Sequence, residues 1–278
     1  MESKRVIYYY QTFDKPDLSS VINNTKCTHI HVAAIHFGKN QDGSPYIHLN
    51  DTPPDDPVHN NVWKQTEELF KKDVKIILMV GGAGGAYVDL FSNFDTYYGL
   101  LKQTLEKYSF ISGIDLDVEE YLGKNGLEKI RMLIRKINND FGDDFIITMA
   151  PVQSSLASDG PGMGGFSYKD LYNSPEGKMI SYFNAQSYGS YGVEDYQAVI
   201  NNGYPPNKVV FGMLSSQYSE DAIRTVRKLC QEFSDFGGVY DWEYFSAQPT
   251  PENWSVNMSM VMETYQQTYG NWLYHMIF

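Results

Sequence analysis

The chain has 278 residues, of which 42% are hydrophobic and 20% charged, and its formal net charge at pH 7 is −12. This acidic balance argues against nucleic acid or an anionic membrane surface as a partner. No stretch approaches the roughly 20 apolar residues of a membrane span, and two cysteines far apart, Cys27 and Cys230, imply no disulfide framework.

Short apolar runs alternate with longer amphipathic runs along the whole chain. The apolar runs predict strands at residues 6–11, 29–36, 75–80, 113–118, 145–150, 180–187, 208–213 and 238–242. The amphipathic runs predict helices at residues 15–23, 58–72, 94–108, 127–141, 168–172, 193–202, 220–236 and 254–269. Alternating strands and helices form parallel βαβ units, and eight such units favour a closed barrel over an open sheet. We therefore expect one α/β domain over residues 1–278, a (β/α)8 TIM barrel.

Three stretches rich in glycine or proline, residues 51–57, 81–85 and 160–165, each follow a predicted strand. They would be loops at the C-terminal end of the barrel, where active sites of this fold are built. The apolar tail at residues 272–278 is too short to cross a membrane, and we expect it to pack on the barrel.

Three carboxylates stand at alternate positions near the end of the fourth predicted strand: Asp115, Asp117 and Glu119. Side chains two residues apart share one face of a strand, so all three should point the same way. A row of buried acids is costly because each charge disfavours ionisation of the next. Glu119 is outermost, and such a row predicts a general acid with a raised pKa. A solvated acidic edge is the alternative, and the apolar opposite face of the strand argues against it.

The segment at residues 113–119 (GIDLDVE) resembles the acidic signature of glycoside hydrolase family 18. Four more segments are similar to the family's motifs in the same order: residues 75–82 (KIILMVGG), 148–152 (TMAPV), 186–188 (QSY) and 237–244 (GGVYDWEY). A closer likeness, notably at residues 48–57, is to compact fungal-type endo-β-N-acetylglucosaminidases. Two positions depart from the family pattern: Ser112 stands where an acid is common, and Met79 stands where serine is usual.

The resemblance implies retaining hydrolysis in which the 2-acetamido group of the substrate is the nucleophile. In that scheme Glu119 is the acid and base, Asp117 orients the acetamido group, and Asp115 supports Asp117. Tyr188 would donate a hydrogen bond to the acetamido oxygen. The residues implied to contact the substrate are Gln186, Trp242, Gly81, Gly82, Tyr8 and Met149.

The leading expectation is an enzyme that cleaves the β-1,4 bond in the N,N'-diacetylchitobiose core of N-glycans. A chitinase is the alternative, since it would cut the same linkage with the same residues. A chitinase favours a long groove lined by tryptophan, and this chain has four tryptophans in all. A glycan-binding, lectin-like barrel is the second alternative. Such relatives commonly lose the terminal glutamate, whereas Glu119 is present.

The expected partner is an N-glycan or chitin-type oligosaccharide, bound by a monomer without a cofactor. His29 and His31 share a strand face, but no further ligand joins them, so we expect core histidines and no metal site. The N-terminus carries no secretory signal pattern. The sequence therefore predicts a cytoplasmic protein, or a secreted one whose leader has been removed.

Overall fold

The computed structural model describes residues 4–23, 26–189 and 191–263. Its strands are β1 (Arg5–Tyr10), β2 (His29–Lys39), β3 (Pro45–Leu49), β4 (Lys75–Gly81), β5 (Ile111–Asp117), β6 (Ile146–Met149), β7 (Tyr182–Ala185), β8 (Val209–Leu214) and β9 (Gly238–Trp242). Its α-helices are α1 (Ser19–Ile22), α2 (Asn60–Phe70), α3 (Tyr87–Ser92), α4 (Phe94–Lys107), α5 (Gly126–Phe141), α6 (Gln153–Leu156), α7 (Tyr168–Asn173), α8 (Val193–Asn201) and α9 (Glu220–Glu232). Short 3₁₀ helices are η1 (Pro57–His59), η2 (Glu176–Met179), η3 (Pro206–Lys208), η4 (Ser215–Gln217) and η5 (Tyr244–Ser246), and residues 251–263 are helical.

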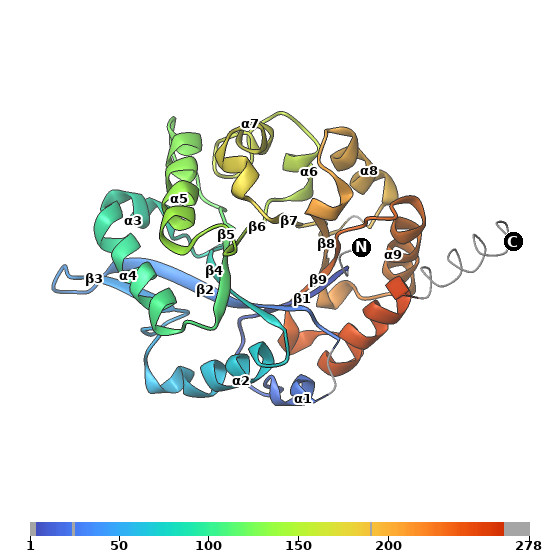
Figure 1. Cartoon of the computed structure of the whole chain (residues 1–278), viewed down its shortest axis with the longest axis horizontal. Coiled ribbons are helices and arrows are strands. Elements are labelled where there is room, and N and C mark those ends of the chain that lie inside the picture. Colours follow the sequence, from blue (N-terminus) through green and yellow to red (C-terminus); the bar gives the residue numbers. More distant parts are fainter. Residues whose placement is uncertain (1–3, 24–25, 190, 264–278) are drawn as a thin grey trace, which may run out of the picture.

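The strands close into a barrel surrounded by helices (Figure 1). All strands of the nine-stranded sheet except β3 pair in parallel, and β1 pairs with both β2 and β9. Within the described residues, eight parallel strands therefore form a closed (β/α)8 barrel, and the predicted fold class is confirmed. Each predicted strand is present with bounds that differ by a few residues at most.

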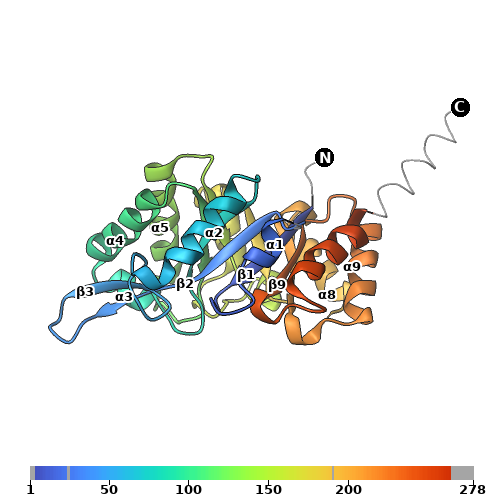
Figure 2. The same cartoon turned by 90° about the horizontal axis from the view of Figure 1, so that it is seen from below.

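A hairpin that the sequence did not predict extends β2 beyond the barrel. β2 turns back at residues 40–44 into β3, which runs antiparallel to it, with Leu49 opposite Ile35. In Figures 1 and 2 this hairpin extends outward past the ring of helices. Gly43 adopts φ 84° in the turn, a conformation that glycine reaches at low cost.

Strand alternation divides the apolar core into two clusters. The cluster inside the barrel contains Ile7, Tyr9, Ala33, Ala34, Met79, Tyr182, Val210 and Tyr240, with Tyr188 and Trp242 packed against it. The larger cluster fills the space between the strands and the helices. In β1, Tyr9 belongs to the inner cluster while Tyr8 and Tyr10 belong to the outer one.

The predicted helix at residues 254–269 is present as far as residue 263, and the remainder lies outside the described residues. The tail at residues 272–278, predicted to pack on the barrel, also lies outside them. Among the helices that are described, none is both long and apolar enough to cross a membrane.

Candidate active site

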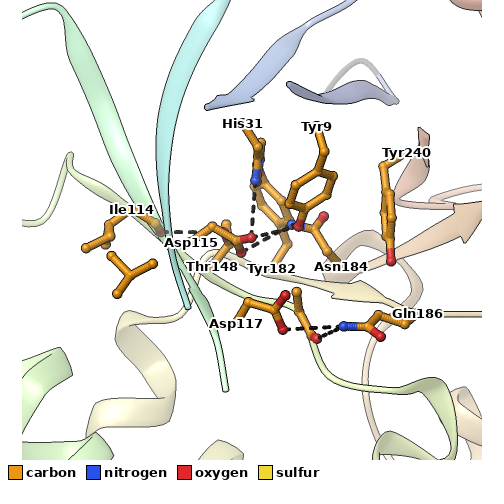
Figure 3. A network of polar contacts seen from close by, with 12 residues as sticks. Tyr9, His31, Ile114, Asp115, Asp117, Thr148, Tyr182, Asn184, Gln186 and Tyr240 are labelled. Atoms are coloured by element: carbon orange, nitrogen blue, oxygen red, sulfur yellow. Dashed lines mark hydrogen bonds and ion pairs between the residues drawn. The ribbon is translucent and has the colours of Figure 1, made fainter. Parts of the chain in front are cut away.

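The acids of the fourth barrel strand gather at its C-terminal end. Asp115 and Asp117 are buried near the end of β5, and Glu119 follows two residues after the strand. The side-chain amide nitrogen of Gln186 lies 3.3 Å from Asp117 Oδ1 and 3.0 Å from Glu119 Oε1. The same nitrogen donates to the carbonyl of Ala150 at 2.8 Å. Gln186 therefore links the two outer acids to the loop after β6, and Figure 3 shows its contact with Asp117.

Asp115 is fully buried and is surrounded by polar side chains from four other strands (Figure 3). Its partners are Tyr9 Oη at 2.7 Å, Thr148 Oγ1 at 2.5 Å, Asn184 Nδ2 at 3.4 Å and His31 Nδ1 at 3.4 Å. Burial alone would raise the pKa of this carboxyl, but the His31 ring and the donated hydrogen bonds hold the pKa of Asp115 below its usual value. These contacts therefore favour the ionised form of Asp115.

Other residues supply the hydroxyl groups that are absent at Met79, the position where the family usually has serine. Met79 is the β4 register partner of Asp115 and belongs to the apolar cluster inside the barrel. Tyr9 and Thr148 supply Asp115 with the hydroxyl donors that Met79 does not. Sequence reasoning missed both, because Tyr9 reaches Asp115 from β1 across the barrel and Thr148 from its register position on the neighbouring β6.

Asp117 has the opposite electrostatic environment. Burial, and then the neighbouring charges of Glu119 and Asp115, raise the pKa of Asp117 well above its usual range. Protonation is therefore easier at Asp117 than at Asp115 beside it. Gly82 donates its backbone N–H to the Asp117 carbonyl at 3.0 Å, and a Cβ on Gly81 would lie 2.2 Å from that same carbonyl oxygen. Both glycines thus let the loop after β4 approach Asp117, while their contact with substrate stays a prediction.

Aromatic side chains form the wall of the site opposite the acids. Tyr188 and Trp242 are half-buried at the ends of β7 and β9. The Tyr240 hydroxyl donates to the Tyr188 hydroxyl oxygen at 3.1 Å. The Tyr9 ring lies 5.3 Å from the Trp242 ring, centroid to centroid. Burial raises the pKa of Tyr188 well above its usual value, so this phenol stays protonated and available as a donor.

Two glutamates directly after site residues attach neighbouring loops to the site. Glu120 Oε1 accepts from the backbone amides of residues 86 and 87, where α3 begins. Glu243 follows Trp242 and accepts from the backbone amides of Gln11 and Thr12 at 3.0 and 2.9 Å. Neither role could be predicted from the sequence, since each depends on a loop distant in the chain.

A polar groove of about 690 Å³ opens where these loops meet the β2–β3 hairpin. Its walls include Gln11 and Thr12 from the loop after β1, and Gly84 and Gly85 from the loop after β4. These are the loops that Glu243 and Glu120 hold. The groove is therefore continuous with the chain segments around the acids.

A comparison with protein families shows the family to which the chain belongs. Residues 4–271 match the family described as "Glycosyl hydrolases family 18". The chain belongs to this family. It is therefore a glycoside hydrolase, and its row of acids, from Asp115 to Glu119, stands where a (β/α)8 barrel presents catalytic groups.

Solved structures of family 18 proteins are similar over most of the chain. A fungal endo-β-N-acetylglucosaminidase of this family shares 32% identity, covers 92% of this chain and 97% of its own, and has a TM-score of 0.80. The chitinase ChiC from Aspergillus fumigatus shares 35% identity, covers 93% and 99%, and has a TM-score of 0.78. A chitinase from Pseudoalteromonas aurantia, at 20% identity over 93% and 100% of the two chains with a TM-score of 0.78, shows the fold alone. No curated protein sequence matches this chain.

The structure contradicts the substrate contacts predicted for Tyr8 and Met149 in this family 18 barrel. Both side chains are fully buried in the cluster between strands and helices. The Tyr8 hydroxyl donates to the Pro251 carbonyl and accepts from Ser255 N at 2.9 Å. Because side chains alternate along a strand, the inward positions belong to their neighbours Tyr9 and Thr148.

Proposed function

We propose that this family 18 hydrolase is an endo-β-N-acetylglucosaminidase that cleaves the N,N'-diacetylchitobiose core of N-glycans with substrate assistance. The observation that carries the proposal is the Gln186 amide nitrogen, which lies 3.3 Å from Asp117 Oδ1 and 3.0 Å from Glu119 Oε1, with Asp115 fully buried on the same strand as Asp117. No second carboxylate is needed as nucleophile when the substrate supplies its own acetamido oxygen. We further propose that the chain works as one catalytic domain.

In the first step, Glu119 gives its proton to the glycosidic oxygen as the bond to the anomeric carbon breaks. The acetamido carbonyl oxygen attacks that carbon and forms an oxazolinium ion. Asp117 accepts a hydrogen bond from the acetamido N–H, and the charge of Asp115 behind it stabilises the positive charge that develops. Tyr188 donates to the acetamido oxygen and holds it in line for attack.

In the second step, the anionic Glu119 takes a proton from a water molecule. The water oxygen bonds to the anomeric carbon, the oxazolinium ring opens, and the acetamido group is restored. Glu119 is protonated again and the anomeric configuration is retained. Gln186 supports both steps because it donates to Glu119 at 3.0 Å and so orients the carboxyl.

The distribution of tryptophan favours an N-glycan over chitin. Trp63 and Trp254 are buried in the core, 5% and 0% exposed, so neither offers a face to a sugar. Among the described residues, Trp242 is then the one tryptophan at the site. A single stacking ring beside a polar groove suits a short core disaccharide with branches better than a long run of N-acetylglucosamine.

Chitinase activity is the second candidate, and a specific observation favours it. The Aspergillus fumigatus chitinase is as similar to the chain as the fungal endo-β-N-acetylglucosaminidase is, at 35% against 32% identity. The catalytic residues serve both substrates. A lectin-like role is disfavoured because Glu119 is present and hydrogen-bonded.

Product analysis separates these functions. The protein is incubated with a high-mannose glycoprotein and, separately, with chitin oligomers, and the products are weighed by mass spectrometry. We expect a glycoprotein that keeps one N-acetylglucosamine at each site. Cleavage of the chitin oligomers alone would exclude the N-glycan function, and binding without cleavage of either substrate would favour the lectin.

Glu119→Gln tests the mechanism, because it keeps the shape of the side chain and removes the transferable proton. Turnover should fall by about 10²–10⁴-fold, with an unchanged unfolding temperature. Glu194→Gln, an exposed acid at the start of α8, is the matched control and should keep full activity. Full turnover by Glu119→Gln would end the mechanism proposed here.

A further inference from the structure

Tyr240 stands behind Tyr188 inside the barrel, and the mechanism above gives it no task. It lies on β9, is fully buried, and belongs to the inner apolar cluster. Its hydroxyl donates to the Tyr188 hydroxyl oxygen at 3.1 Å, and no other hydrogen bond of this group is found among the described residues. Placing a phenol in an apolar interior costs free energy unless its hydroxyl is hydrogen-bonded. The hydrogen bond to Tyr188 therefore offsets the cost of burying the Tyr240 hydroxyl.

The direction of this hydrogen bond matters for Tyr188. A phenol has one proton to donate and lone pairs to accept with. Because Tyr240 fills the acceptor side of Tyr188, the proton of Tyr188 remains free for another acceptor. Burial raises the pKa of Tyr240 well above its usual value, and the adjacent Tyr188 raises it further, so Tyr240 keeps the proton that it donates to Tyr188.

The fold makes room for Tyr240 at this place. Gly212 of β8 is its register partner, and a Cβ there would lie 2.3 Å from the Tyr240 hydroxyl oxygen. The ring therefore lies directly over the β8 backbone, where any larger residue would displace it. On its other side the Tyr9 ring packs edge-on, 5.1 Å away between centroids. In Figure 3 the hydroxyl end of Tyr240 points toward the side of the barrel where Asp117 and Gln186 lie.

We propose that Tyr240 is a positioning residue for Tyr188: by donating to its oxygen, Tyr240 directs the Tyr188 proton toward the acetamido oxygen of the substrate. The inference rests on the proposed function, which gives Tyr188 that acceptor. Tyr240 itself touches no substrate, since its ring is fully buried. Its contribution belongs to the transition state, where the acetamido oxygen donates electron density to the anomeric carbon and its alignment decides the rate.

Tyr240→Phe tests the inference, because it removes one oxygen and keeps the ring in its place. We expect kcat on an N-glycan substrate to fall by roughly 5–10-fold, the loss that one neutral hydrogen bond supports, while KM changes by less than about twofold. Affinity for a thiazoline analogue of the cyclised N-acetylglucosamine should fall by the same factor. Tyr97→Phe is the matched control: Tyr97 is also buried and donates to the Gly38 carbonyl at 3.0 Å, but it lies on α4 outside the barrel, and kcat should not change.

A double-mutant cycle with Tyr188→Phe separates positioning from general packing. If Tyr240 acts through Tyr188, adding Tyr240→Phe to Tyr188→Phe should cause little further loss of kcat. Independent, multiplying losses would overturn the inference, as would full kcat in Tyr240→Phe. Full activity of Tyr188→Phe would instead count against the substrate-assisted mechanism itself, so the two failures are distinguishable.

Discussion

Asp241 is a buried acid on the outer side of β9, next to Trp242. Ser215 Oγ lies 2.5 Å from its Oδ2, and Oδ1 finds no partner among the described residues. Burial, with a smaller contribution from the charge of Glu243, raises the pKa of Asp241 to about 8. The folded protein therefore holds a neutral Asp241 at pH 7, whereas the unfolded chain ionises it.

This difference predicts how stability depends on pH. An acid whose pKa is raised on folding does not lower the free energy of unfolding at a pH below its unfolded pKa, here 3.8. Above that pH it lowers the free energy of unfolding progressively, up to about pH 8. Asp241→Asn stays neutral at every pH. The difference in free energy of unfolding between this variant and the wild type should therefore shift in favour of the variant by roughly 2–3 kcal/mol from pH 5 to pH 7. Urea unfolding at both pH values measures this, and the raised pKa of Asp117 cancels because both proteins contain it. A stability difference that is independent of pH would contradict the assignment.

The same scale shows where prediction from the sequence stops. The alternation of Asp115, Asp117 and Glu119 along one strand was sufficient to place the acids together. It could not say that Asp115 would be ionised by partners from across the barrel, nor that Tyr9 rather than Tyr8 points inward. Three consecutive tyrosines carry no periodicity, so their facing is set by the register of β1 against its neighbours.

At the scale of elements, the loop after β4 is attached through Glu120 to the segment that follows β5. The Glu120 carboxylate accepts from two backbone amides at the start of α3, and Gly82 in the same loop lies against Asp117. Glu120→Ala should leave these amides without an acceptor and lower the free energy of unfolding by about 1–3 kcal/mol. We also expect KM to rise several-fold as the loop loosens.

Glu120→Gln is the matched control for that variant. It keeps an oxygen acceptor at the same place and should recover most of the stability and KM. Urea unfolding and initial-rate kinetics on one substrate measure both quantities. A wild-type KM in Glu120→Ala would show that the loop holds its conformation without this carboxylate.

Elements with a strong period were predictable, and short ones were not. Apolar runs and amphipathic runs located every barrel strand and the longer helices. The β2–β3 hairpin was not predicted, although Asp42 and Gly43 form a dipeptide that is common in hairpin turns. β3 runs antiparallel and interrupts the regular alternation of parallel strands and helices. The βαβ pattern of the whole chain therefore does not predict a strand at this place.

At the scale of the whole molecule, the barrel depends on the seam between its first and last strands. β1 and β9 pair over four residues, beginning with Arg5 opposite Gly238. This contact joins the two ends of the described chain, and no local pattern in the sequence reports it. Gly238 has φ 117°, and a Cβ there would lie 2.1 Å from the Arg5 carbonyl oxygen. Glycine is therefore required for the seam to close.

Two glycine-to-alanine variants should shift stability in opposite directions. Gly238→Ala combines a strained φ with overlap on the β1 backbone, so we expect a loss of at least about 3 kcal/mol in the free energy of unfolding. Gly99→Ala, within α4 and with no atom near the added Cβ, should gain about 0.5–1 kcal/mol because alanine favours the helix. Urea unfolding of both variants measures the pair. Stability of Gly238→Ala equal to that of the wild type would contradict the role of the seam.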